Sequence, residues 1–154
     1  MREGIRLGID VGTVRIGVSR CDRSGFLASP LTTVARAEDG SDLARLVALV
    51  AEHEAIEVIA GLPLALSGRR TASTEDAVDF AERLAAAIAV PVRLVDERLS
   101  TVTATSALRQ SGKNSKKSRT VIDQSAAAVI LQHALDAERA TGRPAGTEIG
   151  AAGA

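Results

Sequence analysis

Residues 5–17 constrain the fold most, because an alternating strand pattern there ends abruptly in a turn. Apolar side chains occupy every second position at Ile5, Leu7 and Ile9, which is the period of a β-strand. A Val-Gly step follows Asp10 and can turn the chain tightly. Asp10 is therefore expected to be a carboxylate at the carboxyl end of a strand, where open α/β sheets bind their ligands.

The remaining pattern predicts an α/β fold with a mixed sheet. Extended stretches over 15–21 and 26–34 follow through short connections, so the first three strands are expected to be antiparallel. Thereafter the apolar periodicity predicts, in order, a helix capped by Ser41, a strand over 57–61, a helix over 74–89, a strand over 92–96, a helix ending near Gln110 and a last helix over 120–140.

The composition suits one domain over 1–140, followed by a disordered tail over 141–154. The single cysteine, Cys21, excludes an intramolecular disulfide. No stretch reaches the roughly 18 apolar residues of a membrane span, and we expect a cytoplasmic protein. The 19 basic and 19 acidic side chains balance, so global charge does not hold this chain on nucleic acid.

Two further acids are expected to join Asp10. The strand before Glu97 is predicted to run parallel to the strand that ends at Asp10, so both acids lie at one edge of the sheet. The last helix supplies Asp123. Gly8 and the alanines at 126–128 are small enough to let the start of this helix pack close to the first strand.

Three carboxylates in one place repel each other, and their pKa values rise unless a cation neutralises them. Mg²⁺ or Mn²⁺ prefers oxygen ligands and keeps positions for water and phosphate oxygens. Two ions about 4 Å apart, bound with substrate, can activate water and stabilise the leaving oxygen of a phosphodiester. Asp10, Glu97 and Asp123 are therefore predicted to be the metal ligands and catalytic residues of a phosphodiester hydrolase.

Each acid also has a purely structural interpretation. Asp10 could shape the turn through an Asx interaction. Asp123 lies three positions after Thr120, and the pair could cap the last helix. Glu97 could pair with Arg98 or face solvent. Only the joint placement of the three acids favours the catalytic interpretation.

Basic residues that could bind nucleic acid gather before the last helix. From Arg109 to Arg119 there are five basic residues and no acid, and the predicted loop over 111–118 could bind phosphates without sequence specificity or remain solvated. The candidates in this region are Lys113, Lys116, Lys117 and Arg119.

Four arginines elsewhere are further candidates. Arg69 and Arg70 lie on a loop that leaves the same edge of the sheet. Arg15 and Arg98 flank two of the acids, so each could hold a carboxylate or a substrate phosphate.

Several motifs together resemble the YqgF/RuvX family of RNase H-like nucleases. The matching segments, in order and spacing, are LGIDVGTVRIG at 7–17, GLP at 61–63, DERLST at 96–101, and IDQSAA with ILQ between 122 and 132. The resemblance covers about residues 4–135. One departure is the segment 113–119, where asparagine and serine dilute an arginine- and lysine-rich run typical of the family.

The resemblance implies an RNase H-like fold, with a five-stranded sheet of order 3-2-1-4-5, strand 2 antiparallel, and helices on both faces. It places the metal site on Asp10, Glu97 and Asp123. It also implies a nuclease that matures the 5′ end of the precursor of 16S ribosomal RNA, while the family's older label is Holliday junction resolvase. Expected partners are therefore an rRNA precursor first, branched DNA second, and a ribosomal particle, with the protein a monomer or weak homodimer.

Other function classes fit less well. Asp-Val-Gly-Thr after a strand also resembles the first phosphate motif of actin-like ATPases and sugar kinases, but those proteins need a second domain and a second glycine-rich loop. A non-catalytic nucleic-acid-binding module would not need Glu97 and Asp123. The only aromatic residues are Phe26 and Phe80, which argues against base stacking as the main source of affinity.

Overall fold

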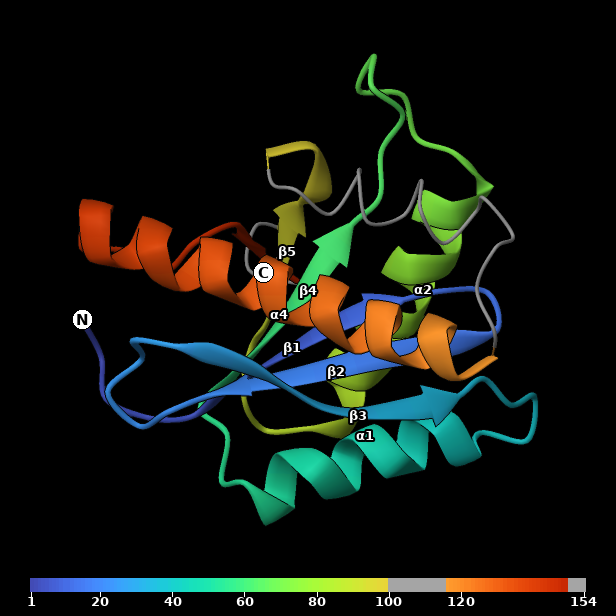
Figure 1. Cartoon of the computed structure of the whole chain (residues 1–154), viewed down its shortest axis with the longest axis horizontal. Helices are drawn as coiled ribbons and strands as arrows, with labels where there is room; N and C mark the ends of the chain where they lie inside the picture. The colour runs from blue at the N-terminus through green and yellow to red at the C-terminus, as the bar shows by residue number, and fades with distance from the viewer. Residues whose placement is uncertain (100–115, 150–154) are drawn as a thin grey trace.

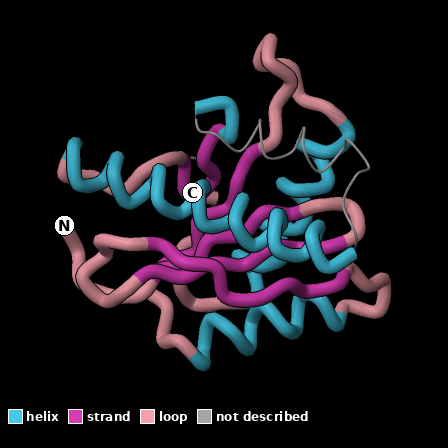
Figure 2. The backbone as a smooth tube through the Cα atoms, viewed as in Figure 1, coloured by secondary structure: helices cyan, strands magenta, loops and turns pink. Residues whose placement is uncertain are grey.

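The computed structural model describes residues 1–99 and 116–149. Within these ranges the chain forms one mixed sheet of six strands in the order β3-β2-β1-β4-β5-β6, with α4 on one face and α1 and α2 on the other (Figures 1 and 2). The strands are β1 Arg6–Val11, β2 Arg15–Cys21, β3 Ala28–Ala35, β4 Glu57–Leu62, β5 Val92–Asp96 and β6 Thr147–Glu148. The helices are α1 Ser41–Glu52, α2 Ala72–Ala87, the 3-10 turn η1 Glu97–Leu99, and α4 Lys116–Thr141.

The pairing confirms the predicted fold class and the order of the first five strands. β2 is antiparallel to both β1 and β3, whereas β4 is parallel to both β1 and β5. None of the helices in the described ranges is both long and apolar enough to cross a membrane.

The prediction of five strands is wrong by one, because β6 pairs antiparallel with β5. The Arg93 side chain donates hydrogen bonds to the carbonyl oxygens of Ala145 and Gly146 at 2.7 and 3.0 Å, and the N–H of Ile149 donates to Val92 at 2.9 Å. These bonds attach part of the segment expected to be a disordered tail. A two-residue strand has no periodicity that a sequence pattern could reveal.

The starts of three helices differ from the predictions. α1 is capped by Gly40 rather than by Ser41, whose N–H is bound by the Asp39 carboxylate at 2.9 Å. α2 begins two residues earlier than predicted, at Ala72.

The described part of α4 begins at Lys116, so residues 116–118 are helical rather than part of a loop. Lysine is a good helix former, and the loop had been inferred from composition alone. The helix predicted to end near Gln110 lies outside the described residues.

The strands alternate between two hydrophobic cores. Leu7 and Ile9 of β1 pack with Phe80 of α2 on one face. On the other face Ile59 of β4 packs with Leu131 of α4. This alternation confirms the period of two in the first strand and leaves the intervening residues, including position 10, on the α4 side.

On the α4 side the helix lies almost directly on the backbone of β1 and β2. A Cβ atom on Gly8 would lie 2.8 Å from Cβ of Leu131 and 2.9 Å from the carbonyl oxygen of Ala127, and one on Gly17 would overlap the carbonyl of Asp123. The Ser19 hydroxyl donates to the Ala127 carbonyl at 2.7 Å. The predicted close approach of the last helix to the first strand is therefore confirmed.

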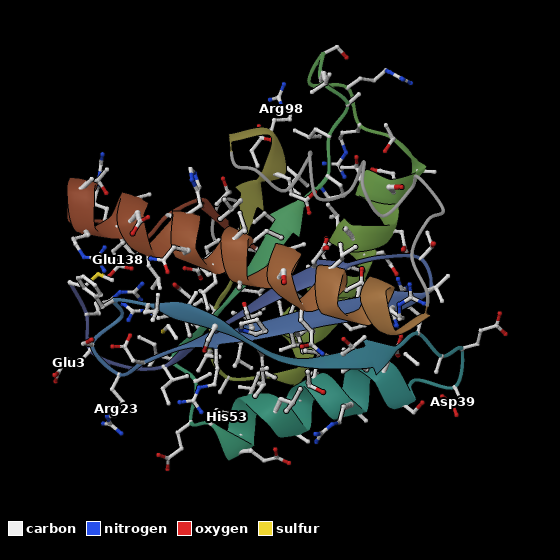
Figure 3. All side chains as sticks on the ribbon, in the orientation of Figure 1. Glu3, Arg23, Asp39, His53, Arg98 and Glu138 are labelled. Atoms are coloured by element: carbon white, nitrogen blue, oxygen red, sulfur yellow. The ribbon has the colours of Figure 1, made fainter. Side chains whose placement is uncertain are left out.

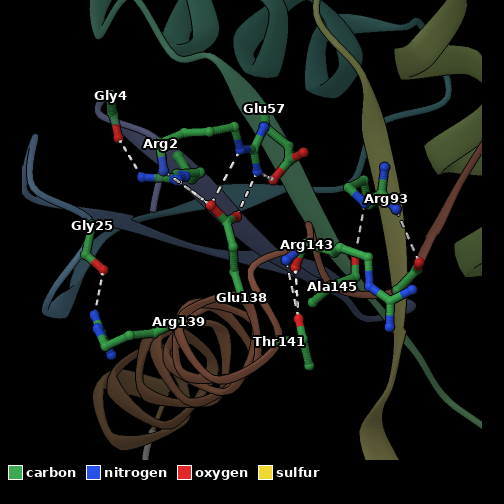
Figure 4. A network of polar contacts seen from close by, with 12 residues as sticks. Arg2, Gly4, Gly25, Glu57, Arg93, Glu138, Arg139, Thr141, Arg143 and Ala145 are labelled. Atoms are coloured by element: carbon green, nitrogen blue, oxygen red, sulfur yellow. Dashed lines mark hydrogen bonds and ion pairs between the residues drawn. The ribbon is translucent and has the colours of Figure 1, made fainter.

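A largely buried ion-pair network joins the C-terminal part of α4 to the first residues of β1 and β4 (Figure 4). Arg2 Nη2 lies 2.6 Å from Glu138 Oε1 and 3.1 Å from Glu57 Oε1, and Arg6 Nη2 lies 3.1 Å from Glu138 Oε2. Burial alone would raise the pKa of Glu138, but hydrogen bonds from Arg2 and the charges of both arginines together hold that pKa below its usual value. The network fastens the end of α4 to the amino ends of β1 and β4.

Substituting Gly8→Ala should destabilise the protein, because the added methyl group would meet the backbone and side chains of α4. Overpacking of this kind costs about 1–3 kcal/mol of unfolding free energy. Denaturant unfolding followed by circular dichroism measures it, with Ala86→Ser on the exposed face of α2 as the control. An unchanged unfolding midpoint for Gly8→Ala would contradict the close contact.

Glu138→Gln should remove a stabilisation that depends on pH. Because the folded-state pKa is lowered, the wild-type ion pairs act fully above the unfolded-state pKa of about 4.3 and weaken as the pH falls through the folded-state value. We expect a loss of about 3 kcal/mol at pH 7 that shrinks below about pH 4. Urea unfolding at several pH values tests this, with the exposed Glu82→Gln as the control. A difference that does not depend on pH would refute it.

Candidate functional site

A cleft of about 440 Å³ opens where β1 and β5 end and α4 passes. Asp10, Glu97 and Asp123 all line it, and their exposed fractions are only 6%, 9% and 3%. The structure thus brings the three predicted acids to one cleft although they are far apart in sequence. The other lining residues are Val11, Gly12, Thr13, Val14, Arg15, Pro63, Leu64, Ala65, Thr71 and Ser73.

Asp10 is held by a strand and by a closed turn. It is the next-to-last residue of β1 and pairs in register with Gly17 of β2. The N–H of Gly12 donates to the carbonyl of Arg15 at 2.9 Å, and Arg36 donates to the Gly12 carbonyl at 2.8 Å. Backbone and arginine contacts therefore close the turn that follows the acid.

Glu97 begins η1 directly after β5 and lies over β4. A Cβ atom on Gly61 would lie 3.0 Å from Glu97 Cγ and 2.7 Å from Cδ1 of Ile130. The absence of a side chain at position 61 thus makes the space that the Glu97 side chain occupies. Neither a strand pattern nor a turn motif signals this role for Gly61.

The Arg98 side chain binds Asp96, the residue that precedes Glu97. Its guanidinium donates to both Asp96 oxygens at 2.7 to 3.1 Å, and its N–H donates to Asp96 Oδ1 at 2.9 Å. Hydrogen bonds from Arg98 hold the pKa of Asp96 below its usual value. Of the two roles predicted for Arg98, the structure therefore shows the one that holds a carboxylate. That carboxylate belongs to Asp96 rather than to Glu97.

Asp123 lies inside α4, with Thr120 also within the helix rather than at its cap. The capping interpretation of this pair is therefore wrong. Arg15 Nε lies 2.8 Å from Asp123 Oδ2, and both side chains are largely buried. Of the two roles predicted for Arg15, the structure shows the one that holds a carboxylate.

The donor set fits a hard divalent cation in its chemistry. Mg²⁺ prefers carboxylate oxygens and is usually held by one or two of them together with water and phosphate. Among residues 1–99 and 116–149, no three His, Cys, Asp or Glu side chains converge closely enough to form a complete metal cage. Asp10, Glu97 and Asp123 are the carboxylates of the cleft that could hold a metal, and the Asp123 carboxylate also pairs with Arg15.

The other predicted basic residues lie in different surroundings. Arg70 forms a double ion pair with Glu75, with contacts of 2.7 to 3.1 Å, and Arg69 is exposed beside it. The backbone of Lys116, Lys117 and Arg119 belongs to the first turns of α4, on the same helix as Asp123. Lys113 lies outside the described residues.

Sequence patterns missed Thr71 and Ser73, two residues that line the cleft. Thr71 caps α2 through a reciprocal bond with Thr74, and Ser73 follows it into the cleft wall. Thr74 stands where a capping box usually has glutamate or glutamine. The sequence pattern therefore placed the start of α2 too late, after both residues.

Arg36, which lies between β3 and α1, was missed as well. It binds the Gly12 carbonyl, forms two bonds with Asp76 at 2.8 and 3.0 Å, and stacks on Phe80 at 5.4 Å. Only tertiary structure brings these partners together, so no sequence signal could have identified it.

Gly61→Ala should weaken metal binding while leaving the fold intact, because the new methyl group would displace the Glu97 carboxylate. Changes to the groups that orient a metal ligand typically cost about 10- to 100-fold in affinity. Calorimetric titration with Mn²⁺ measures the effect, and circular dichroism checks the fold. Equal Mn²⁺ affinity in both proteins would show that Glu97 does not contribute as a ligand.

Comparison with known proteins identifies a family and close relatives of this chain. The RuvX family, described as Holliday junction resolvase, matches residues 4–137. A Leifsonia xyli protein named "Putative pre-16S rRNA nuclease" is 65% identical over 149 residues, covering 97% of this chain and 96% of that protein. A Streptomyces coelicolor protein of the same name is 53% identical over 150 residues, covering 97% and 90%.

A solved structure, Thermus thermophilus RuvC in complex with a Holliday junction substrate, shares the fold. Its TM-score is 0.57 at 18% identity, with 92% of this chain and 99% of that chain covered. The family match spans all three acids of the cleft and most of the chain. The protein described above therefore belongs to the RuvX family.

Proposed function

We propose that the protein is a metal-dependent endonuclease that hydrolyses a phosphodiester bond in the precursor of 16S ribosomal RNA, at its 5′ end. The observation that carries the proposal is the cleft in which Asp10, Glu97 and Asp123 lie together. The names of the relatives at 53–65% identity support the RNA substrate. The chemistry of the three carboxylates supports phosphodiester hydrolysis.

In this proposal the chain's own residues hold and orient the reacting groups. Asp10, Glu97 and Asp123 would hold one or two Mg²⁺ or Mn²⁺ ions, and the metal would supply an activated water and neutralise developing charge. Arg36 fixes the turn after Asp10 through the Gly12 carbonyl, and Gly61 leaves room for Glu97. Arg15 keeps the Asp123 carboxylate oriented within the cleft.

Nucleic-acid affinity would come from local basic groups, because the chain as a whole has no net charge. Arg69 is exposed on the loop that follows β4, and Lys116, Lys117 and Arg119 precede Asp123 on α4. Contacts of this kind read the phosphate backbone, so binding should weaken steeply with salt. We propose that the protein acts in the cytoplasm on a free precursor or on a ribosomal particle, as a monomer or weak dimer.

The second candidate is resolution of Holliday junctions, which the description of the matching family favours. A resolvase must cut two symmetry-related strands, and it would act as a symmetric dimer. The same carboxylates would serve both reactions. The two candidates therefore differ in substrate and in the symmetry of the products, not in the residues of the site.

Asp10→Asn should abolish cleavage of a labelled fragment that spans the 5′ end of the 16S rRNA precursor. Loss of a metal ligand removes several kcal/mol of transition-state stabilisation, so the rate should fall by about 10²-fold or more. EDTA should have the same effect on the wild type, and added Mg²⁺ or Mn²⁺ should reverse it. The control is Asp79→Asn, an exposed acid on α2 that pairs only with its neighbour Arg83 among the described contacts.

A four-way DNA junction is assayed beside the RNA. Symmetric junction cleavage that Asp10→Asn abolishes, without RNA cleavage, would replace the proposed substrate by the second candidate. Cleavage that survives Asp10→Asn unchanged would refute the catalytic role of the cleft. Binding of RNA without cleavage by the wild type, alone or with ribosomal particles, would indicate a non-catalytic module.

A further inference from the structure

Residues 64–70 form a small hairpin at the rim of the cleft, called the rim hairpin below. Leu64 and Arg70 form an antiparallel bridge, and the N–H of Ala65 donates to the Arg69 carbonyl at 3.0 Å. Gly68, with φ +90°, closes the tip through a 2.8 Å bond to Ala65. Figure 1 shows the hairpin rising from the end of β4, away from the sheet. Backbone hydrogen bonds therefore order this segment, which is a hairpin rather than an irregular loop.

Leu66 lies at the tip of the rim hairpin and is 81% exposed. Its carbonyl accepts a hydrogen bond from Arg98 Nη1 at 3.3 Å, and the same guanidinium is hydrogen-bonded to Asp96. Figure 3 labels Arg98 on η1. The tip is therefore tied to the end of β5, next to Glu97. The hairpin presents this apolar side chain directly after Leu64 and Ala65, which line the cleft.

A second apolar side chain faces solvent at the cleft. Val14, in the turn between β1 and β2, is 62% exposed and belongs to the cleft lining. Single exposed apolar side chains are common on protein surfaces. Two of them bordering one cleft of buried carboxylates, with exposed Arg69 on the same hairpin, define a rim that combines apolar and cationic contacts.

Neither aromatic side chain can serve the cleft. Phe80 is fully buried against α2 and the sheet. Phe26 lies on the turn between β2 and β3, where Arg139 stacks on it at 4.8 Å. An apolar contact to a base at the reacting end of the molecule would have to come from an aliphatic side chain.

We propose that Leu66 is a wedge that inserts beside a nucleobase next to the scissile phosphate. Apolar side chains such as leucine unstack base steps in other nucleic-acid complexes, at a cost of a few kcal/mol per step. That cost is least where pairing is already broken. The wedge therefore directs cleavage to a junction between paired and unpaired RNA, and this inference rests on the proposed nuclease function.

The test compares Leu66→Ser with Leu27→Ser, which changes a side chain that is 63% exposed on the turn between β2 and β3. Each variant is assayed on a version of the precursor fragment designed so that the cleavage step lies at the end of a paired stem. An unpaired strand with the same sequence around that step serves as the second substrate. Leu66→Ser should lower kcat/KM on the stem substrate about tenfold, equivalent to about 1.4 kcal/mol, and change the unpaired strand less than twofold. Leu27→Ser should change neither.

A binding measurement separates the wedge from a general loss of activity. In the Asp10→Asn background, RNA carrying the fluorescent base 2-aminopurine beside the mapped cleavage position should brighten on binding, because an unstacked base fluoresces more strongly. Adding Leu66→Ser should abolish that increase. Adding Leu66→Met, which keeps an apolar side chain of similar volume, should preserve it.

The outcomes distinguish this inference from the proposed function. Wild-type cleavage with no difference between Leu66→Ser and Leu27→Ser, or an unchanged 2-aminopurine signal, overturns the wedge and leaves the nuclease standing. Equal losses on the stem and the unpaired strand also overturn it, since they indicate a general contact. A wild type that neither cleaves nor binds either RNA removes both the wedge and the proposed function.

Discussion

The contact between the backbone of α4 and the backbone of β1 and β2 is the constraint on which the site depends. Gly8 and Gly17 lie under the helix where any side chain would collide with it, and Ser19 ties the helix carbonyl of Ala127 to the sheet. Because the helix lies this low, Asp123 reaches Arg15 and the cleft in which Asp10 lies. A helix standing at the ordinary distance of a layer of side chains would hold its acid well away from the strand ends.

Much of this arrangement could be read from the sequence because it follows from regular periods. The alternation around Asp10 and the short or helical connections between strands predicted the strand directions, whereas the strand order came from the family resemblance. Parallel strands necessarily bring Asp10 and Glu97 to one edge. The features that could not be predicted do not follow any periodic pattern of apolar residues. β6 has two residues and depends on the Arg93 side chain. The partners of Arg36 come from the turn after β1, from α1 through Asp42 and from α2.

Arg15 and Arg98 show why neighbouring charges alone could not settle side-chain roles. Each stands close to a predicted ligand in sequence, and the two looked equivalent. In the structure Arg15 crosses to Asp123 on another element, whereas Arg98 turns back to Asp96 and also binds the rim hairpin. The surroundings decide the difference, because Arg15 begins β2, on which α4 lies, whereas Arg98 follows Asp96 by two residues in η1.

The network of Arg2, Arg6, Glu57 and Glu138 lies at the amino ends of β1 and β4 (Figure 4). The acids of the cleft lie instead at the carboxyl ends of β1 and β5 and on α4. The same helix, α4, contributes to both, near one end through Asp123 and near the other through Glu138. An engineer could therefore reinforce or replace the anchoring charges to raise heat resistance without redesigning the reactive end. Conversely, the rim hairpin could be exchanged to alter substrate choice with the anchor left in place.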